Sequence, residues 1–399
     1  MARANSASMV LSRESLQENM KRVPHVLVDA RYHRNPRGGD RCRFELTSRL
    51  LQRQTERYSV LAYAHAAEQL KLWGANVELA PYTPAEHPQA DWFEHVTLPN
   101  IARRIKADIY HATFSIFPLR RSTPIDIVTI HDMAMFAMPE AYGRYAGPFG
   151  RFRTVSAIRG ADCILTVSQT TKDEIVRYLP WAAKKRIVPI LNGVSPDFLD
   201  ASQMERSAVD EIVRRVGLQQ PYILFVGNLE RKKNIQRLIE AFVQGREKYK
   251  WPHHLVIVGE KPPRLPPEIS ASGEVPPGVV FTGYVEDQYL PALYSGAALV
   301  AYPSIYEGFG LPVIEGMAAG TPVLTSNVSS LPEVAGGCAQ LVDPFDVNAI
   351  CEGLNRALHD ETWRKQAVES GLERARQLSW DANAQQTADI YHQLLDERA

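Results

Sequence analysis

The sequence contains no long hydrophobic run, since no apolar stretch reaches the roughly 18 to 20 residues that a membrane-spanning helix needs. Its first 20 residues lack the continuous apolar core of a secretory signal, so we expect none. Cysteine is scarce, and its four residues form no Cys-x-x-Cys pair. That pattern argues against a zinc site and for reduced thiols in the cytosol. A P-loop is also missing, so nothing supports hydrolysis of a nucleoside triphosphate.

Net charge is zero, with 45 basic and 45 acidic side chains, but the two halves of the chain differ. Residues 21–200 hold 25 lysines and arginines against 18 aspartates and glutamates, a balance of +7. Residues 201–399 hold 18 against 25, a balance of −7. A basic first half can attract an anionic surface or substrate, although ordinary variation in composition explains the same asymmetry.

The 399 residues are too many for one ordinary core, so we expect two domains. Short apolar runs alternate with helical patterns, which predicts parallel sheets with helices on both faces. The predicted strands are residues 25–30, 59–64, 76–82, 108–114, 125–132, 163–168, 186–194, 222–229, 254–260, 279–285, 298–304 and 321–327. The pattern lapses over residues 196–221, and we place the boundary near Leu199. Ligands of such sheets bind beyond the carboxyl ends of the strands, which points to the cleft between the domains.

Two glutamates flank a Gly-Phe-Gly turn in the stretch YPSIYEGFGLPVIEGMAAGTPVL, residues 302–324. A strand precedes the turn, and Pro312 suits the first turn of the helix that follows. Glu307 lies before the turn and Glu315 about one helical turn beyond it, so the two carboxylates can face the two ends of one ligand. Carboxylates accept hydrogen bonds from sugar hydroxyls. The alternative is a helix entry with two solvated glutamates.

Basic residues crowd a second helix entry, in GNLERKKNIQRLIEAF at residues 227–242. Positive charge at a helix N-terminus opposes the helix dipole, which suggests an anion nearby. Lys232 and Lys233 could stabilise the charge that develops on a diphosphate leaving group. We expect Asn234 to cap the helix.

The stretch at residues 306–346 resembles the signature of the family 4 glycosyltransferases, and the resemblance extends to VGNLERKKNIQRLIEAF and, less specifically, to TIHDMAMFAMPE, LTVSQTTKDEIVRYL and LNGVSPDF. It implies the GT-B architecture: two doubly wound, Rossmann-like domains facing across a cleft. The domains would be residues 21–199 on the acceptor side and 200–379 on the donor side. Residues 380–399 would form a terminal helix that crosses back to the first domain.

The resemblance also implies roles for individual residues. Glu307 would lie at the transferred sugar, Glu315 at the ribose, and Lys233 at the diphosphate. His131, at the end of a first-half strand, would face the sugar, with Asp132 orienting its ring. Together with Lys232, the other donor-binding candidates are Gly38, Gly39, Asn228, Tyr284, Phe309, Gly310 and Leu311. Lys232 stands where the family usually has arginine, and lysine cannot make the bidentate fork. His111, at another strand end, would lie on the acceptor side.

The implied activity is transfer of a hexose from a nucleoside-diphosphate sugar, GDP-mannose or similar, to an acceptor hydroxyl with retention, in surface polysaccharide or glycolipid assembly. No Asp-x-Asp metal motif occurs, so we expect neither a metal nor another cofactor. The partners would be the donor and a sugar or lipid-linked acceptor, with no nucleic acid. Two alternatives remain open: a nucleotide-sugar epimerase, and a non-catalytic scaffold that binds sugar nucleotides.

The segment YGRYAGPFGRFRTVSAIRG, residues 142–160, combines basic and aromatic residues. Its arginines are Arg144, Arg151, Arg153 and Arg159, and among its aromatic residues are Tyr145, Phe149 and Phe152. Such a segment could touch an anionic membrane that carries a lipid-linked acceptor. Alternatively, the aromatic residues pack in the core and the arginines are solvated. We therefore expect a cytoplasmic protein, and leave open its attachment to the inner face of a membrane.

Overall fold

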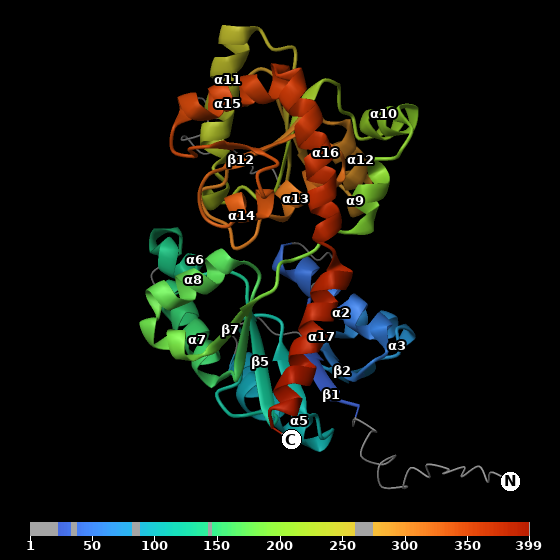
Figure 1. Ribbon diagram of the computed structural model, residues 1–399, viewed down its shortest axis with the longest axis vertical. Coiled ribbons are helices and arrows are strands. Elements are labelled where there is room, and N and C mark those ends of the chain that lie inside the picture. The colour runs from blue at the N-terminus through green and yellow to red at the C-terminus, as the bar shows by residue number, and fades with distance from the viewer. Residues whose placement is uncertain (1–22, 33–37, 82–87, 143–145, 260–273, 399) are drawn as a thin grey trace, which may run out of the picture.

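The computed structural model describes residues 23–32, 38–81, 88–142, 146–259 and 274–398. Two α/β domains lie one above the other, and the described part of the chain begins and ends in the first domain (Figure 1). Both sheets are parallel throughout. Among the described residues, no helix is both long and apolar enough to span a bilayer.

The first domain contains a seven-stranded sheet in the order β3-β2-β1-β4-β5-β6-β7. Its strands are β1 (His25–Asp29), β2 (Arg57–Ala62), β3 (Asn76–Leu79), β4 (Ile109–Ala112), β5 (Ile125–Ile130), β6 (Cys163–Thr166) and β7 (Arg186–Pro189). Its helices and helical turns are α2 (Gly39–Arg53), η1 (Ala64–Ala66), α3 (Ala67–Leu72), α4 (Pro88–Trp92), η2 (Phe93–Thr97), α5 (Leu98–Arg104), α6 (Ala134–Ala137), η3 (Pro139–Ala141), α7 (Ala146–Gly160), α8 (Gln169–Tyr178) and η4 (Pro180–Lys184).

Separate apolar clusters cover the two faces of this sheet, as a doubly wound domain requires. One joins the sheet to α2 and α3 through residues such as Leu50 and Leu70. The other joins it to α5, α7 and α8 through Ala102, Ile158 and Ile175. Strands β1 and β5 between them are buried along their whole length, which explains their mostly apolar sequences.

The second domain contains a six-stranded sheet in the order β10-β9-β8-β11-β12-β13. Its strands are β8 (Tyr222–Val226), β9 (His254–Val258), β10 (Val279–Gly283), β11 (Leu299–Tyr302), β12 (Val323–Ser326) and β13 (Gln340–Val342). Its helices and turns are α9 (Pro196–Ala201), α10 (Arg206–Arg215), η5 (Arg231–Lys233), α11 (Ile235–Tyr249), η6 (Asp287–Tyr289), α12 (Leu290–Gly296), α13 (Leu311–Ala318), α14 (Leu331–Ala335), α15 (Val347–His359) and α16 (Glu361–Gln377).

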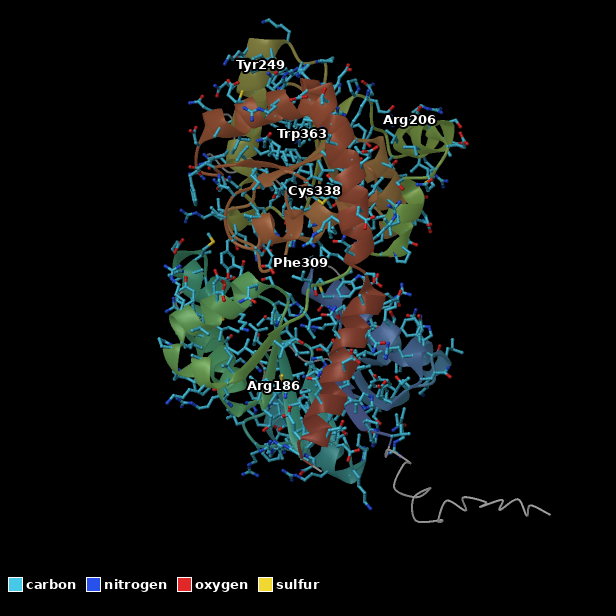
Figure 2. All side chains as sticks on the ribbon, in the orientation of Figure 1. Arg186, Arg206, Tyr249, Phe309, Cys338 and Trp363 are labelled. Carbon is cyan, nitrogen blue, oxygen red and sulfur yellow. The ribbon has the colours of Figure 1, made fainter. Side chains whose placement is uncertain are left out.

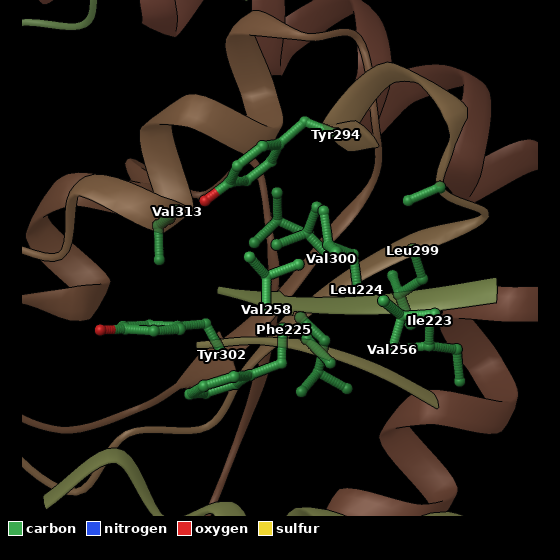
Figure 3. Close-up of a cluster of buried hydrophobic side chains, with 14 of the residues drawn as sticks. Ile223, Leu224, Phe225, Val256, Val258, Tyr294, Leu299, Val300, Tyr302 and Val313 are labelled. Carbon is green, nitrogen blue, oxygen red and sulfur yellow. The ribbon is translucent and has the colours of Figure 1, made fainter. Parts of the chain in front are cut away.

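The core of the second domain places aliphatic strand residues beneath helix residues (Figure 3). Val300 of β11 lies beneath Tyr294 of α12, and the rings of Phe225 and Tyr302 stack with centroids 5.5 Å apart. Tyr302 is the last residue of β11 and is packed in this core. The first residues of the loop that follows are therefore held in place.

The chain crosses between the domains twice. Leu199, where the sequence analysis divides the chain, lies within α9, and its neighbour Phe198 packs in the second core. After α16 the chain returns as α17 (Trp380–Asp396), which packs against α2 and the first sheet (Figure 1). The predicted α/β architecture of two doubly wound domains is confirmed, although β13 is absent from the predicted strands.

Candidate active site

A cavity of about 420 Å³ lies between the two domains, a volume suited to a small-molecule ligand. Phe309, in its lining, lies where the two domains meet (Figure 2). All twelve residues predicted to be catalytic or donor-binding line this cavity: Gly38, Gly39, His131, Asn228, Lys232, Lys233, Tyr284, Glu307, Phe309, Gly310, Leu311 and Glu315. The structure thus brings them together, while the role of each stays a prediction.

The loop between β11 and α13 carries both glutamates and depends on its glycines. Gly310 precedes α13 with φ of +107°, a backbone conformation that favours glycine. A Cβ at Gly308 would lie 1.8 Å from the carbonyl oxygen of His131, so only glycine lets the loop approach the first domain this closely. The loop is therefore built against a strand end of the opposite domain.

Glu307 is buried in a cluster of donors. Its Oε1 accepts hydrogen bonds from Lys233 Nζ at 2.6 Å, Tyr302 OH at 2.8 Å and Ser304 Oγ at 2.8 Å. Burial opposes ionisation of this carboxyl most strongly, but Lys233 and Lys232 outweigh it and hold the pKa of Glu307 below its usual range. The carboxylate therefore stays ionised at neutral pH and can accept further hydrogen bonds.

The two lysines lie on the short turn η5, before α11. Lys232 Nζ lies 3.7 Å from carboxylate oxygens of both Asp132 and Glu230. Burial opposes the charge of this ammonium most, yet the facing carboxylates of Asp132 and Glu307 raise the pKa of Lys232. Asn234 occupies the N-cap position of α11, as predicted, but its side chain makes no capping bond and donates instead to the carbonyl oxygens of Pro303 and Pro344.

Glu315 has one partner from each domain. Tyr294 OH donates to Oε2 at 2.7 Å, and Arg41 Nη1 of the first domain donates to Oε1 at 3.0 Å. Roles for Arg41, Tyr294 and Tyr302 were not predicted from the sequence. Arg41 belongs to the same Gly-Gly segment as Gly39, but its partner lies 274 residues away, so no local signal identifies it.

His131 donates through Nε2 to the carbonyl oxygen of Thr113 at 2.9 Å. Burial lowers the pKa of His131, so the ring is neutral at pH 7 and its Nδ1 is a hydrogen-bond acceptor. The prediction that Asp132 orients this ring is wrong: its carboxylate accepts from the backbone N–H of Ala134 and faces Lys232.

His111 does not lie on an acceptor surface, which corrects the sequence-based expectation. It is fully buried and bonded to Tyr391 OH of α17 at 2.6 Å and to Thr129 Oγ1 at 2.8 Å. Burial lowers the pKa of His111 to about 3. This histidine joins the sheet to the terminal helix.

The remaining candidates line the rim of the cavity. Gly38 has φ of +52° and immediately precedes α2, while Tyr284 follows β10 and is 50% exposed. Asn228 follows β8. Within the described ranges, no group of three or more histidine, cysteine, aspartate or glutamate side chains is arranged to hold a metal ion.

Comparisons with known proteins indicate the family of the chain. Residues 37–198 match the model of Glycosyltransferase Family 4, and residues 210–374 match that of Glycosyl transferases group 1. O-antigen chain mannosyltransferase B of Escherichia coli is 33% identical over 291 residues, which are 72% of this chain and 75% of that protein.

Solved structures share the fold. Sucrose-phosphate synthase from Thermosynechococcus elongatus superposes with a TM-score of 0.71 at 22% identity, over 94% of this chain and 100% of that one. The Anabaena protein HepE, solved in complex with UDP-glucose, gives 0.70 at 17% identity, over 92% and 99%. The two family models and the similarity to the E. coli protein together show that the chain belongs to the family 4 type of glycosyltransferases.

Proposed function

We propose that the chain transfers a hexose, mannose from GDP-mannose or a close analogue, to an acceptor hydroxyl in surface polysaccharide or glycolipid assembly. The observation that carries the proposal is the gathering of Glu307, Glu315 and Lys233 in one interdomain cavity. The similarity to an O-antigen mannosyltransferase supports the sugar and the type of product.

The cavity suits a transfer that needs no protein nucleophile. The bond between the anomeric carbon and the diphosphate breaks, and the electron pair leaves with the diphosphate. Lys233 and Lys232 would stabilise this charge. The acceptor hydroxyl bonds to the anomeric carbon from the same face and gives its proton to a departing phosphate oxygen. Glu307 and the neutral His131 would hold the sugar through its hydroxyls. Retention follows from this same-face route.

A panel of nucleotide sugars with oligosaccharide acceptors tests the activity. We expect release of the nucleoside diphosphate only with both substrates present, fastest with GDP-mannose, and an α-linked product by NMR. Isomerised donor without acceptor would instead identify an epimerase. Binding of the nucleotide without turnover of any pair would favour the scaffold.

We also propose that the reaction needs no metal, because Lys232, Lys233 and the N-terminus of α13 can neutralise the diphosphate. Turnover after treatment with a chelator should equal that of the untreated enzyme. Loss of turnover that added Mg²⁺ restores would contradict this part of the proposal.

We also propose a membrane contact through α7. Phe149 and Phe152 are 44% and 59% exposed, so these two rings do not pack in the core. The Arg153 guanidinium lies 5.2 Å from the ring centroid of Phe149 and 3.7 Å from a carboxylate oxygen of Asp91. Trp92, which follows Asp91 in the sequence, is 66% exposed. Arg144 and Tyr145 lie outside the described residues.

Co-sedimentation with vesicles tests this contact. We expect binding to anionic vesicles that falls at high salt and is weakened by Phe152→Ser combined with Arg153→Ser. The control is Phe345→Ser with Arg237→Ser, which removes a similar exposed ring and stacked arginine from the second domain. Equal binding of both double variants would place the contact elsewhere.

A further inference from the structure

Arg41 reaches across the cleft from the first turn of α2 to the second domain. Its guanidinium donates to Glu315 Oε1 at 3.0 Å and lies 5.2 Å from the ring centroid of Phe198. Burial opposes its charge most, but Glu315 and the more distant Glu45 raise the pKa of Arg41. Arg41 therefore lines the cavity as a permanently charged side chain.

Among the residues that the structure describes, carboxylates outnumber cations in the lining of the cavity. The three described cations are Arg41, Lys232 and Lys233. The five described carboxylates are Asp132, Glu230, Asp287, Glu307 and Glu315. A diphosphate that enters this cavity gains from the cations only if other groups take over the carboxylates.

Two of these carboxylates are each paired with a cation across a short hydrogen bond. Glu307 is paired with Lys233 at 2.6 Å, and Glu315 with Arg41 at 3.0 Å. In the function proposed above, which this inference presupposes, sugar hydroxyls donate to Glu307 and ribose hydroxyls to Glu315. The diphosphate of such a donor lies between its sugar and its ribose, and so between the two cations.

We propose that Arg41 is a donor-binding residue that contacts the diphosphate from the first domain, opposite Lys233 of the second. A guanidinium has five N–H donors in a planar fork that suits phosphate oxygens. Ribose hydroxyls replace it at Glu315, and the freed donors turn to the neighbouring phosphate. The diphosphate of the donor then contacts cations of both domains. It therefore favours the closed arrangement, by which we mean the arrangement of the structure, with the two domains in contact around the cavity.

The affinity of the variants for a series of ligands tests the role of Arg41. The ligands are the nucleoside, its monophosphate and its diphosphate, each measured by calorimetry on the full chain. For Arg41→Ala and Arg41→Gln we expect a loss that grows with each phosphate and reaches about 10- to 100-fold for the diphosphate. Nucleoside affinity should stay within about threefold of wild type, since its hydroxyls need only Glu315. Arg41→Lys should recover part of the loss, because it keeps the charge without the fork.

Arg49→Ala is the matched control. Arg49 lies on the same helix with the same 22% side-chain exposure, and its ion pair with Asp381 is 3.9 Å long. This variant should bind all three ligands as wild type does. Thermal unfolding of each variant verifies that the fold is intact.

Two results would overturn the assignment of Arg41. One is diphosphate affinity equal to wild type in both Arg41→Ala and Arg41→Gln. The other is an equal loss for all three ligands, which would mean that Arg41 only orients Glu315. Failure of the wild-type chain to bind any nucleoside diphosphate would instead refute the proposed function, and this inference with it.

Discussion

Lys233 and Glu307 form a buried ion pair, which a donor bound as proposed above would separate. Tyr302 OH completes a triangle with them, since it accepts from Lys233 Nζ at 2.7 Å and donates to Glu307 Oε1 at 2.8 Å. The Tyr302 hydroxyl can therefore stay bonded to both Lys233 and Glu307 when a bound donor separates these two side chains from each other. Substituting either Lys233 or Glu307 leaves the other charge buried and unpaired. Such a variant should therefore change stability as well as activity.

We predict that Lys233→Ala folds and loses turnover by roughly 10² or more at saturating donor, as loss of a charge-stabilising donor does. Turnover and thermal unfolding are measured together, because Glu307 loses its nearest cation in this variant. Lys248→Ala, which removes a half-exposed lysine paired with Glu352, is the control. Near-wild-type turnover of Lys233→Ala would show that another group carries the charge of the leaving group.

Glu315 should contribute to binding rather than to chemistry. Hydrogen bonds to ribose are made equally in the ground state and the transition state, so their loss weakens binding without slowing the bound complex. We predict that Glu315→Ala lowers affinity for the nucleoside about tenfold or more, as loss of charged hydrogen bonds does. Glu240→Ala, at an exposed carboxylate on α11, is the control. Unchanged nucleoside affinity would exclude the ribose assignment.

The terminal helix α17 is held to the first sheet by a buried polar contact. Tyr391 is fully buried and its hydroxyl meets His111 Nδ1 at 2.6 Å. The sequence of β4, which contains His111, could not reveal this contact, because the partner of His111 is supplied by the last described helix, 280 residues away. A strand-end histidine therefore has the same sequence pattern whether it faces a ligand or another helix.

We predict that this contact makes stability depend on pH. The pKa of His111 falls from 6.5 in a free chain to about 3 when buried. Between these values the unfolded chain binds one more proton, so the free energy of unfolding falls by up to about 1.4 kcal/mol for each pH unit of acidification. His111→Gln should show a flatter dependence of thermal stability on pH over this window, whereas the exposed His359→Gln should match wild type. The same slope in His111→Gln and wild type would assign the dependence to other groups.

Local patterns predicted the elements and the cavity well, but not the pairings across the cleft. Glu307, Lys233 and Gly308 follow strands, and the carboxyl ends of parallel strands share one edge, so their convergence could be foreseen. The partnership of Arg41 with Glu315 could not be, because it depends on how the two domains face each other. The short strand β13 was not predicted because Gln340–Val342 has no long apolar run of its own. It is recognised as a strand by its pairing with β12.

Several contacts hold the two domains together around the glutamate-bearing loop. Tyr306 OH accepts from the backbone N–H of Met133 at 2.9 Å and donates to Glu174 at 2.6 Å. Ser168 Oγ donates to the carbonyl oxygen of Gly308 at 2.7 Å. These bonds position the loop only when the domains are close, so donor binding and closure should depend on each other.

Glu333 of α14 also connects the two domains, because it binds the N-terminus of α8 in the first domain. Its Oε1 accepts from the backbone N–H of Gln169 at 2.8 Å, and its Oε2 from that of Thr170 at 3.1 Å. These N–H groups have no partner within their helix, and the helix dipole favours a negative charge at this end. The carboxylate therefore stabilises the closed arrangement without touching the cavity.

We predict that Glu333→Gln lowers the closed-to-open ratio about tenfold, as the loss of charge-assisted hydrogen bonds would. X-ray scattering of the ligand-free protein should give a larger radius of gyration than wild type, and a saturating nucleoside diphosphate should reduce the difference. The affinity for that ligand should fall, because part of the binding free energy is then spent on closing the domains. Glu369→Gln on α16, an exposed glutamate of the same domain, should change neither quantity. An unchanged radius of gyration together with unchanged affinity in Glu333→Gln would mean that other contacts determine closure, with the bonds of Tyr306 the next to be tested.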